Sequence, residues 1–157
     1  MDCHSTDEMK SDTKSNVNCN YFLVQRREKV RNISKFLYAV LVTPDDNITV
    51  IPYPKRTADQ LDELHWMEDQ VKGKVEMVDG LITGSDTAMI VNEQGKILGL
   101  PHNDTAQALL VRQTDYIVGN ALILCAVGEE LTGFTREEAE AVSLVIKAEK
   151  ERLGKYF

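Results

Sequence analysis

The chain has 157 residues, of which 43% are hydrophobic and 27% are charged, values typical of a soluble globular protein about one domain in size. Its net charge of −7 argues against broad binding of the whole chain to nucleic acid or to an anionic membrane. The longest apolar run, residues 121–127, is too short to span a bilayer, and the N-terminus lacks a signal pattern. We therefore expect a cytoplasmic protein with no membrane partner, and an odd number of cysteines fits that compartment.

Charge divides the first 36 residues into two segments. Residues 1–20 are polar and carry four acidic and two basic side chains, and Val17 is their only aliphatic residue apart from two methionines. Such a segment buries too little apolar surface to offset its ordering entropy, so we expect a disordered polar tail. Residues 21–36 reverse the sign, with five cations and one anion, and are called the basic collar below.

The basic collar allows two interpretations. Its cations, beside Tyr21 and Phe22, could bind nucleic acid or the acidic surface of a partner. Alternatively, it is a short helix or arm whose cations lie on the acidic remainder of the same chain. We expect nucleic acid as a partner only through the cations of this collar, chiefly Arg26, Arg27, Lys29 and Arg31.

Residues 37–157 are expected to form a single domain that begins with a β-hairpin. The segments 37–43 and 48–53 are apolar and β-branched, and turn-forming residues lie between them. Pro52 has no N–H donor, which indicates an edge strand or a strand end.

A helix is predicted after the hairpin. Thr57 can cap its N-terminus with Gln60 as the reciprocal partner, and Gly73 suits a left-handed stop. Trp66 lies off the apolar stripe, so we expect it to cover the edge of the core or an interface. The stripe itself, at spacings of three and four, is Leu61, Leu64, Met67 and Val71.

Three short strands are expected in the middle of the chain. Residues 74–78 form the first, and 88–91 and 96–100 form a second hairpin. Gly95 ends the turn between the last two strands, where a positive φ is expected.

The last elements are a long strand and a helix. Residues 116–127 are the strongest strand pattern, with a bulge or a close backbone approach expected at Gly119. A capping box of Thr135 and Glu138 opens a helix that extends to about residue 153. Its predicted buried stripe is Val142, Val145 and Ile146. The fold class is therefore α+β, a largely antiparallel sheet of about six strands with two main helices and one short helix.

The row of residues 100–104 can be understood as structure alone. Pro101 ends a strand, and Asp104 or Thr105 can cap a short helix with Gln107 as the capping-box partner. Asn103 can adopt a left-handed turn or bond its own backbone.

The same row also has a binding interpretation, because a helix N-terminus offers free N–H groups and a positive dipole to an anion. Nearby side chains, including Arg112 or Arg56, would add specificity for a phosphate or a nucleotide edge. Under this hypothesis the ligand-binding residues are Pro101, His102, Asn103, Asp104 and Arg112.

Motifs for catalysis and metal binding are missing from the sequence. There is no glycine-rich phosphate loop, no nucleophile elbow, no HExxH and no CxxC. Cys125 lies in the strongest strand and is expected to be a small core residue. The carboxylate pairs at 129–130 and 137–138 fall in a loop and a first helical turn, which is typical of solvated charge. We expect no catalytic residue, no metal site and no cofactor.

Two motif segments occur in order along this chain. The first motif segment, residues 93–103, follows an EGK-x-x-GLP-x-N pattern, with Gln94 inserted after Glu93. The second motif segment, residues 115–119, follows D-x-I-x-G. Together they resemble a known family, the domain of unknown function 3846, and the resemblance covers roughly residues 37–142. The matching residues are Glu93, Gly95, Lys96, Gly99, Leu100, Pro101, Asn103, Asp115, Ile117 and Gly119.

The resemblance implies an uncharacterised small protein of phage, plasmid or other mobile DNA, and it supplies no activity. Proteins of that kind often act by binding. We expect a non-catalytic binding or accessory protein that engages a host protein through its acidic face and Trp66. The alternatives are a binder of a small anionic, nucleotide-like ligand through residues 100–104 and a DNA-associated protein that uses the basic collar.

Overall fold

The computed structural model describes residues 37–54, 60–112 and 115–154, all within one compact unit, Phe36–Phe157. The predicted tail, the basic collar and the helix cap at Thr57 lie outside these described residues. Within them the α+β class is confirmed, with six strands paired antiparallel and three helices. None of these described helices is long and apolar enough to cross a membrane.

The sheet is built around one fully apolar strand. Its order is β2 (Ile48–Tyr53), β1 (Leu37–Val42), β5 (Ala121–Val127), β4 (Thr87–Asn92) and β3 (Val75–Val78), and β6 (Glu130–Thr132) pairs with the end of β5. Strand β5 is central because it is buried on both faces, and Cys125 within it is a core residue as expected. The predicted first hairpin is confirmed as β1 and β2, and Pro52 lies in the edge strand.

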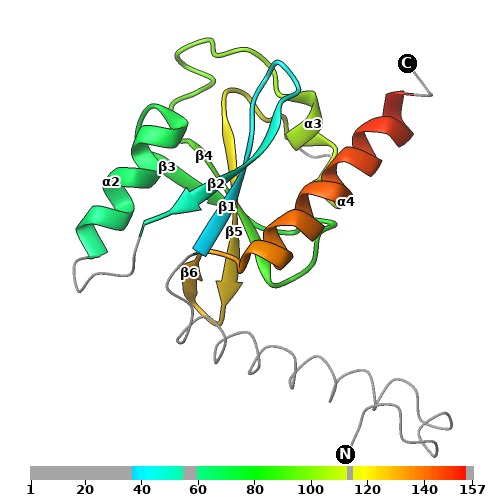
Figure 1. Ribbon diagram of the computed structural model, residues 1–157. Coiled ribbons are helices and arrows are strands. Elements are labelled where there is room, and N and C mark those ends of the chain that lie inside the picture. The colour runs from blue at the N-terminus through cyan, green and yellow to red at the C-terminus, as the bar shows by residue number, and fades with distance from the viewer. Residues whose placement is uncertain (1–36, 55–59, 113–114, 155–157) are drawn as a thin grey trace, which may run out of the picture. The chain divides into compact units, whose positions relative to one another are not determined.

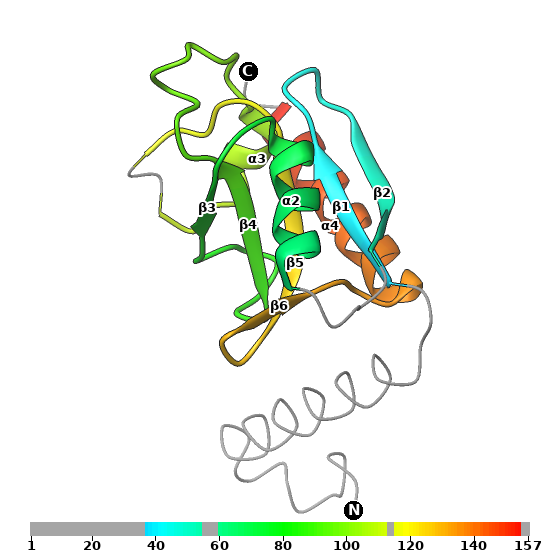
Figure 2. The same ribbon diagram turned by 90° about the vertical axis from the view of Figure 1, so that its left-hand side faces the viewer.

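Helices cover both faces of the sheet (Figures 1 and 2). Helix α2 (Gln60–Val71) packs on one face, whereas α3 (Asp104–Gln107) and α4 (Arg136–Gly154) pack on the other. Successive side chains of a strand point to opposite faces, so Ile123 packs toward α4 and Leu124 toward α2. The result is a three-layer arrangement with a core on each side of the sheet.

Helix α2 is confirmed, but its apolar stripe is only partly buried. Met67 and Val71 lie in the core, whereas Leu64 is 39% exposed. Trp66 packs edge-to-face on Tyr53 with ring centroids 5.1 Å apart, so it covers the edge of the core, one of its two expected roles.

The left-handed stop of α2 was expected at Gly73 and is at Lys72 instead, with φ of 64°. Asn92 explains the change, because its Nδ2 donates to the carbonyls of Val71 at 3.2 Å and Lys72 at 3.1 Å. A Cβ at position 73 would lie 2.6 Å from that Nδ2. Glycine is therefore needed there for close approach, not for a positive φ.

Helix α4 begins at the predicted capping box. The Glu138 N–H donates to Thr135 Oγ1 at 3.2 Å, and the Thr135 N–H donates to Glu138 Oε1 at 3.0 Å. Of the predicted stripe, Ile146 is buried and Val142 is half-buried, but Val145 is 44% exposed, so that part of the prediction was wrong. The other positions facing the sheet are taken by Ala139 and Ser143.

The prediction of a strand at residues 96–100 was wrong, because residues 93–99 form consecutive turns. The reason is that β4 pairs with β3 on one side and β5 on the other, so β4 has no free edge for a hairpin partner.

One further strand begins later than expected, and one strand was not predicted. The long strand begins at Ala121 instead of residue 116, because Gly119 has a φ of 73° that interrupts the extended backbone. Strand β6 was not predicted, and Glu130 within it was expected in a loop, since three residues are too few to show an alternating pattern.

Candidate functional site

The two motif segments, far apart in sequence, pair through their backbones. The N–H of Asn103 donates to the Ile117 carbonyl at 2.8 Å, and the N–H of Gly119 donates to the Pro101 carbonyl at 2.8 Å. Residues 100–104 are therefore anchored to the second motif segment and do not form a free loop.

Asn103 is the centre of this junction and is completely buried. Its Nδ2 donates to the carbonyl of Val42 in β1 at 3.0 Å and to the carbonyl of Gly119 at 2.8 Å. Its Oδ1 accepts a hydrogen bond from the Ala106 N–H at 3.1 Å, which makes Asn103 the N-cap of α3. One amide thus joins β1, the second motif segment and a helix.

The cap predicted at Asp104 or Thr105 was wrong, as was the left-handed turn at Asn103, whose φ is −113°. A capping residue must precede the helix, and Asp104 is already its first residue. Gln107, expected to complete a capping box, instead bridges to the second motif segment. Its Nε2 donates to the Asp115 carbonyl at 2.6 Å, and its Oε1 accepts from the Ile117 N–H at 2.8 Å.

Leu100 packs between two glycines of the motifs. A Cβ at Gly119 would lie 2.8 Å from Leu100 Cδ1, and one at Gly95 would lie 3.4 Å from the same atom and 2.8 Å from Val118. The close approach expected at Gly119 is confirmed. Gly95 does not have the expected positive φ, which occurs at Gly99 with φ of 68°.

Charged and aromatic motif residues meet on the surface of this junction. Lys96 forms an ion pair with Asp115, and its Nζ lies 4.5 Å from the ring centroid of Tyr116. The His102 ring stacks on the same Tyr116 ring at 5.1 Å with an interplanar angle of 16°. The hydrogen bond between Lys96 and Asp115 raises the pKa of the lysine and lowers that of the carboxyl, which the Tyr116 N–H lowers further.

Two large apolar side chains project from the turns formed by residues 93–99. Ile97 is 86% exposed and Leu98 is 59% exposed, and together they are called the apolar tip below. The turn that carries them is held by the Leu98 N–H to the Gln94 carbonyl at 2.9 Å and the Leu100 N–H to the Gly95 carbonyl at 3.0 Å. The strand predicted at residues 96–100 did not anticipate that Ile97 and Leu98 are exposed. Two adjacent aliphatic residues in a short segment between Gly95 and Gly99 were the sequence signal that could have indicated it.

The predicted ligand-binding residues separate into exposed and buried groups. Pro101, His102, Asp104 and Arg112 are exposed, whereas Asn103 is buried and uses its amide on the chain itself. Arg56 lies outside the described residues. The role of this row in binding an anion stays a prediction.

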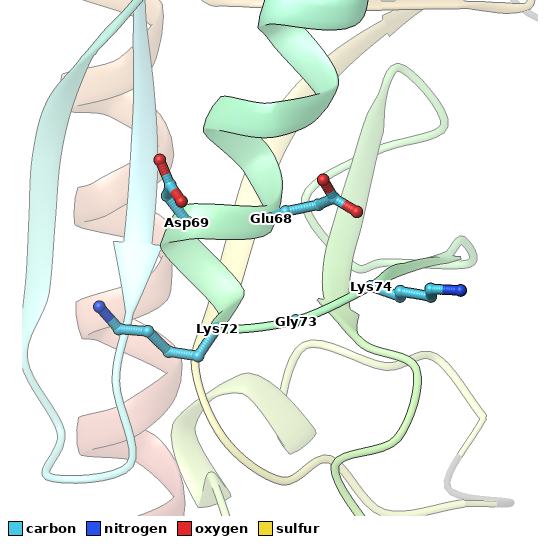
Figure 3. A pocket seen from close by; sticks show the side chains of 5 residues that line it. All are labelled: Glu68, Asp69, Lys72, Gly73 and Lys74. Carbon is cyan, nitrogen blue, oxygen red and sulfur yellow. The ribbon is translucent and has the colours of Figure 1, made fainter.

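A depression of about 570 Å³ lies elsewhere, at the C-terminal end of α2. Figure 3 shows its lining side chains directed apart, with Lys72 and Lys74 on opposite sides of Gly73. Charged groups that diverge in this way do not converge on one ligand. Among the described side chains, no three histidine, cysteine or acidic residues gather closely enough to hold a metal ion.

Comparison with protein families gives a match over most of the described chain. A family model described as a domain of unknown function (DUF3846) matches residues 38–147, which include both motif segments and the apolar tip. No curated protein and no solved structure matches the chain.

Proposed function

This chain belongs to the DUF3846 family, and from that premise we propose that it is a non-catalytic binding protein that engages a protein partner through the apolar tip. The observation that carries the proposal is the exposure of Ile97 and Leu98 on a loop held in place by motif residues. We further propose that this partner is a host protein, in line with the origin on mobile DNA that the sequence resemblance implies.

The apolar tip is suited to binding because its backbone is already ordered. A loop held by its own hydrogen bonds, and by the Lys96–Asp115 ion pair beside it, loses little further entropy when a partner docks. Two adjacent aliphatic side chains exposed in this way lose contact with water on binding, and each contributes about 1.5–3 kcal/mol if fully buried. A charged and aromatic rim lies beside the tip. Lys96 precedes Ile97 in the sequence and lies over the ring of Tyr116, on which His102 stacks. These side chains can supply directional contacts to a partner.

Asn103 supports a protein partner over a small anion. Its amide has three hydrogen bonds within the chain, so it offers no free donor to a phosphate at the row of residues 100–104. Helix α3 has four residues, too short for a strong dipole. DNA association through the basic collar stays a separate prediction that concerns residues outside the described part of the chain.

Affinity capture from host lysate with the immobilised full-length chain tests the proposal. We expect a specific host protein to be retained by the parent chain and lost with Ile97→Ser/Leu98→Ser. Met77→Ser is the matched control, because Met77 is 56% exposed on β3, away from the tip.

Equal capture by the parent chain and the double variant would contradict the proposal, as would the absence of any specifically retained protein. A thermal shift with a nucleotide panel addresses the anion alternative. Stabilisation by a nucleotide that disappears in His102→Ala would favour that alternative instead.

A further inference from the structure

Helix α4 lies on one face of the sheet (Figure 1), and its side away from the sheet carries exposed apolar residues. Ala139 and Ile146 are fully buried against the sheet. On the other side, Leu144 is 64% exposed and Val145 is 44% exposed. The exposed apolar residues recur at the spacing of one helical face, and they are Ala141, Leu144, Val145 and Ala148. We call these four residues the outer stripe.

Four exposed charges run along one edge of the outer stripe. In chain order they alternate in sign, and they are Arg136, Glu140, Lys147 and Glu151. At 100° per residue all four fall within one narrow sector of the helix beside the stripe. Arg136 lies 3.7 Å from Glu140 of the same helix. The edge is therefore a row of positive, negative, positive and negative charge.

This row is complementary to itself when it is reversed. In an antiparallel pair of α4 helices related by a twofold axis, Arg136 of one copy faces Glu151 of the other, and Glu140 faces Lys147. Both charge pairs are centred just before Leu144, and the outer stripe is centred between Leu144 and Val145, so the two centres lie within about one residue of each other. A parallel pair would instead bring together the two acidic first turns, which contain Glu137 and Glu138.

We propose that two copies of this chain associate through α4, with the outer stripes in contact and the helices antiparallel. The two alanines allow the helix axes to approach closely, while Leu144 and Val145 fill the centre of the contact. Each charge pair occurs twice because of the symmetry, and the dimer extends the existing Arg136–Glu140 pair into a longer network. Since the stripe has only four side chains, we expect a Kd of roughly 10–100 µM.

Sedimentation velocity of the full chain, over a range of concentrations, tests the proposal. We expect a concentration-dependent change from the monomer mass of 17.7 kDa to twice that mass. Leu144→Gln/Val145→Gln should abolish the dimer, because it removes the two apolar side chains at the centre of the contact. Glutamine has a good helix propensity, so α4 should stay folded in this variant. Leu64→Gln, at an exposed position on α2, is the matched control and should leave the Kd unchanged.

Charge reversal tests the antiparallel arrangement itself. Glu140→Lys and Lys147→Glu, each alone, should weaken the dimer roughly tenfold, because each disrupts two symmetric pairs. The double reversal should restore the parent Kd, since the two pairs re-form with exchanged signs. Glu129→Lys, in the turn between β5 and β6, is the control for net charge and should have little effect.

Three results would overturn the proposal. These are a monomer at every concentration, a dimer that persists when the outer stripe is replaced, and a double reversal that remains as weak as the single ones. Circular dichroism of each variant would verify that α4 is still folded.

Discussion

Asn103 Nδ2 donates a hydrogen bond to the Gly119 carbonyl oxygen at 2.8 Å, and this buried contact joins the first motif segment to the second. The same nitrogen reaches the Val42 carbonyl in β1, 61 residues earlier in the chain. Buried polar groups need such partners because an unsatisfied one costs the full desolvation penalty. The asparagine is thus a structural residue of the motif, whose exposed neighbours remain available for binding.

Replacement of Asn103 should be severe. Asn103→Ala removes one donor from each of two buried carbonyls and removes the cap of α3, so we expect a loss of roughly 3 kcal/mol or more in the free energy of unfolding. Asn103→Asp should be no better, because its oxygens would face carbonyl oxygens. Urea denaturation measures both, and Asp104→Ala, at an exposed position outside the cap, should cost less than about 1 kcal/mol. A larger loss at Asp104 than at Asn103 would show that the cap is misassigned.

Gly119 and Gly99 offer a matched pair of substitutions. Both have positive φ, but a Cβ at Gly119 would lie 2.8 Å from Leu100, whereas one at Gly99 would have no neighbour within 4 Å. Gly99→Ala should therefore cost only the backbone strain, about 1 kcal/mol, and Gly119→Ala should cost roughly 1–3 kcal/mol more. Thermal unfolding of the two variants provides the comparison. Equal losses would mean that Leu100 moves aside at no cost.

The capping box of α4 should contribute measurably to stability. Thr135→Ala removes the hydroxyl that accepts the Glu138 N–H, so we expect a loss of about 1 kcal/mol. Thr135→Ser keeps the hydroxyl and should recover most of the loss in chemical denaturation. If serine were as destabilising as alanine, the threonine methyl group would be the important part of the side chain.

The Lys96–Asp115 pair should make a stability contribution that is lost at both extremes of pH. The pKa of Asp115 is lowered from 3.8, so its contribution is present above that value and disappears as the pH falls through the lowered pKa. The pKa of Lys96 is raised from 10.5, so its contribution is present below that value and disappears as the pH rises through the raised pKa.

Melting temperatures of the parent chain and Asp115→Asn between pH 2 and 11 measure this effect. Asparagine keeps an oxygen for the Tyr116 N–H but removes the ion pair. The difference between the two proteins should be small, because both side chains are substantially exposed, and constant between roughly pH 5 and 9. The difference in melting temperature should become smaller as the pH falls toward 2, because Asp115 then becomes protonated and the ion pair is lost. A difference that is independent of pH throughout would show that the ion pair does not stabilise the loop.

Local patterns in the sequence determined the fold class, the first hairpin and both ends of the capping box. These features depend on contacts between near neighbours, or on burial that a continuous apolar run such as β5 makes unavoidable. The motif residues were visible in the same way, and their family assignment is confirmed.

The tertiary structure alone decided what those motif residues do. Residues 96–100 have a strand-like composition, but a strand also needs a free edge, and β3 and β5 occupy both edges of β4. The exposure of Ile97 and Leu98 follows from that competition. Asn103 was compatible with a turn by local rules, yet its partners lie 16 and 61 residues away. A short polar side chain has the same local preferences in both settings, and only the folded chain brings the distant carbonyls within reach of its amide.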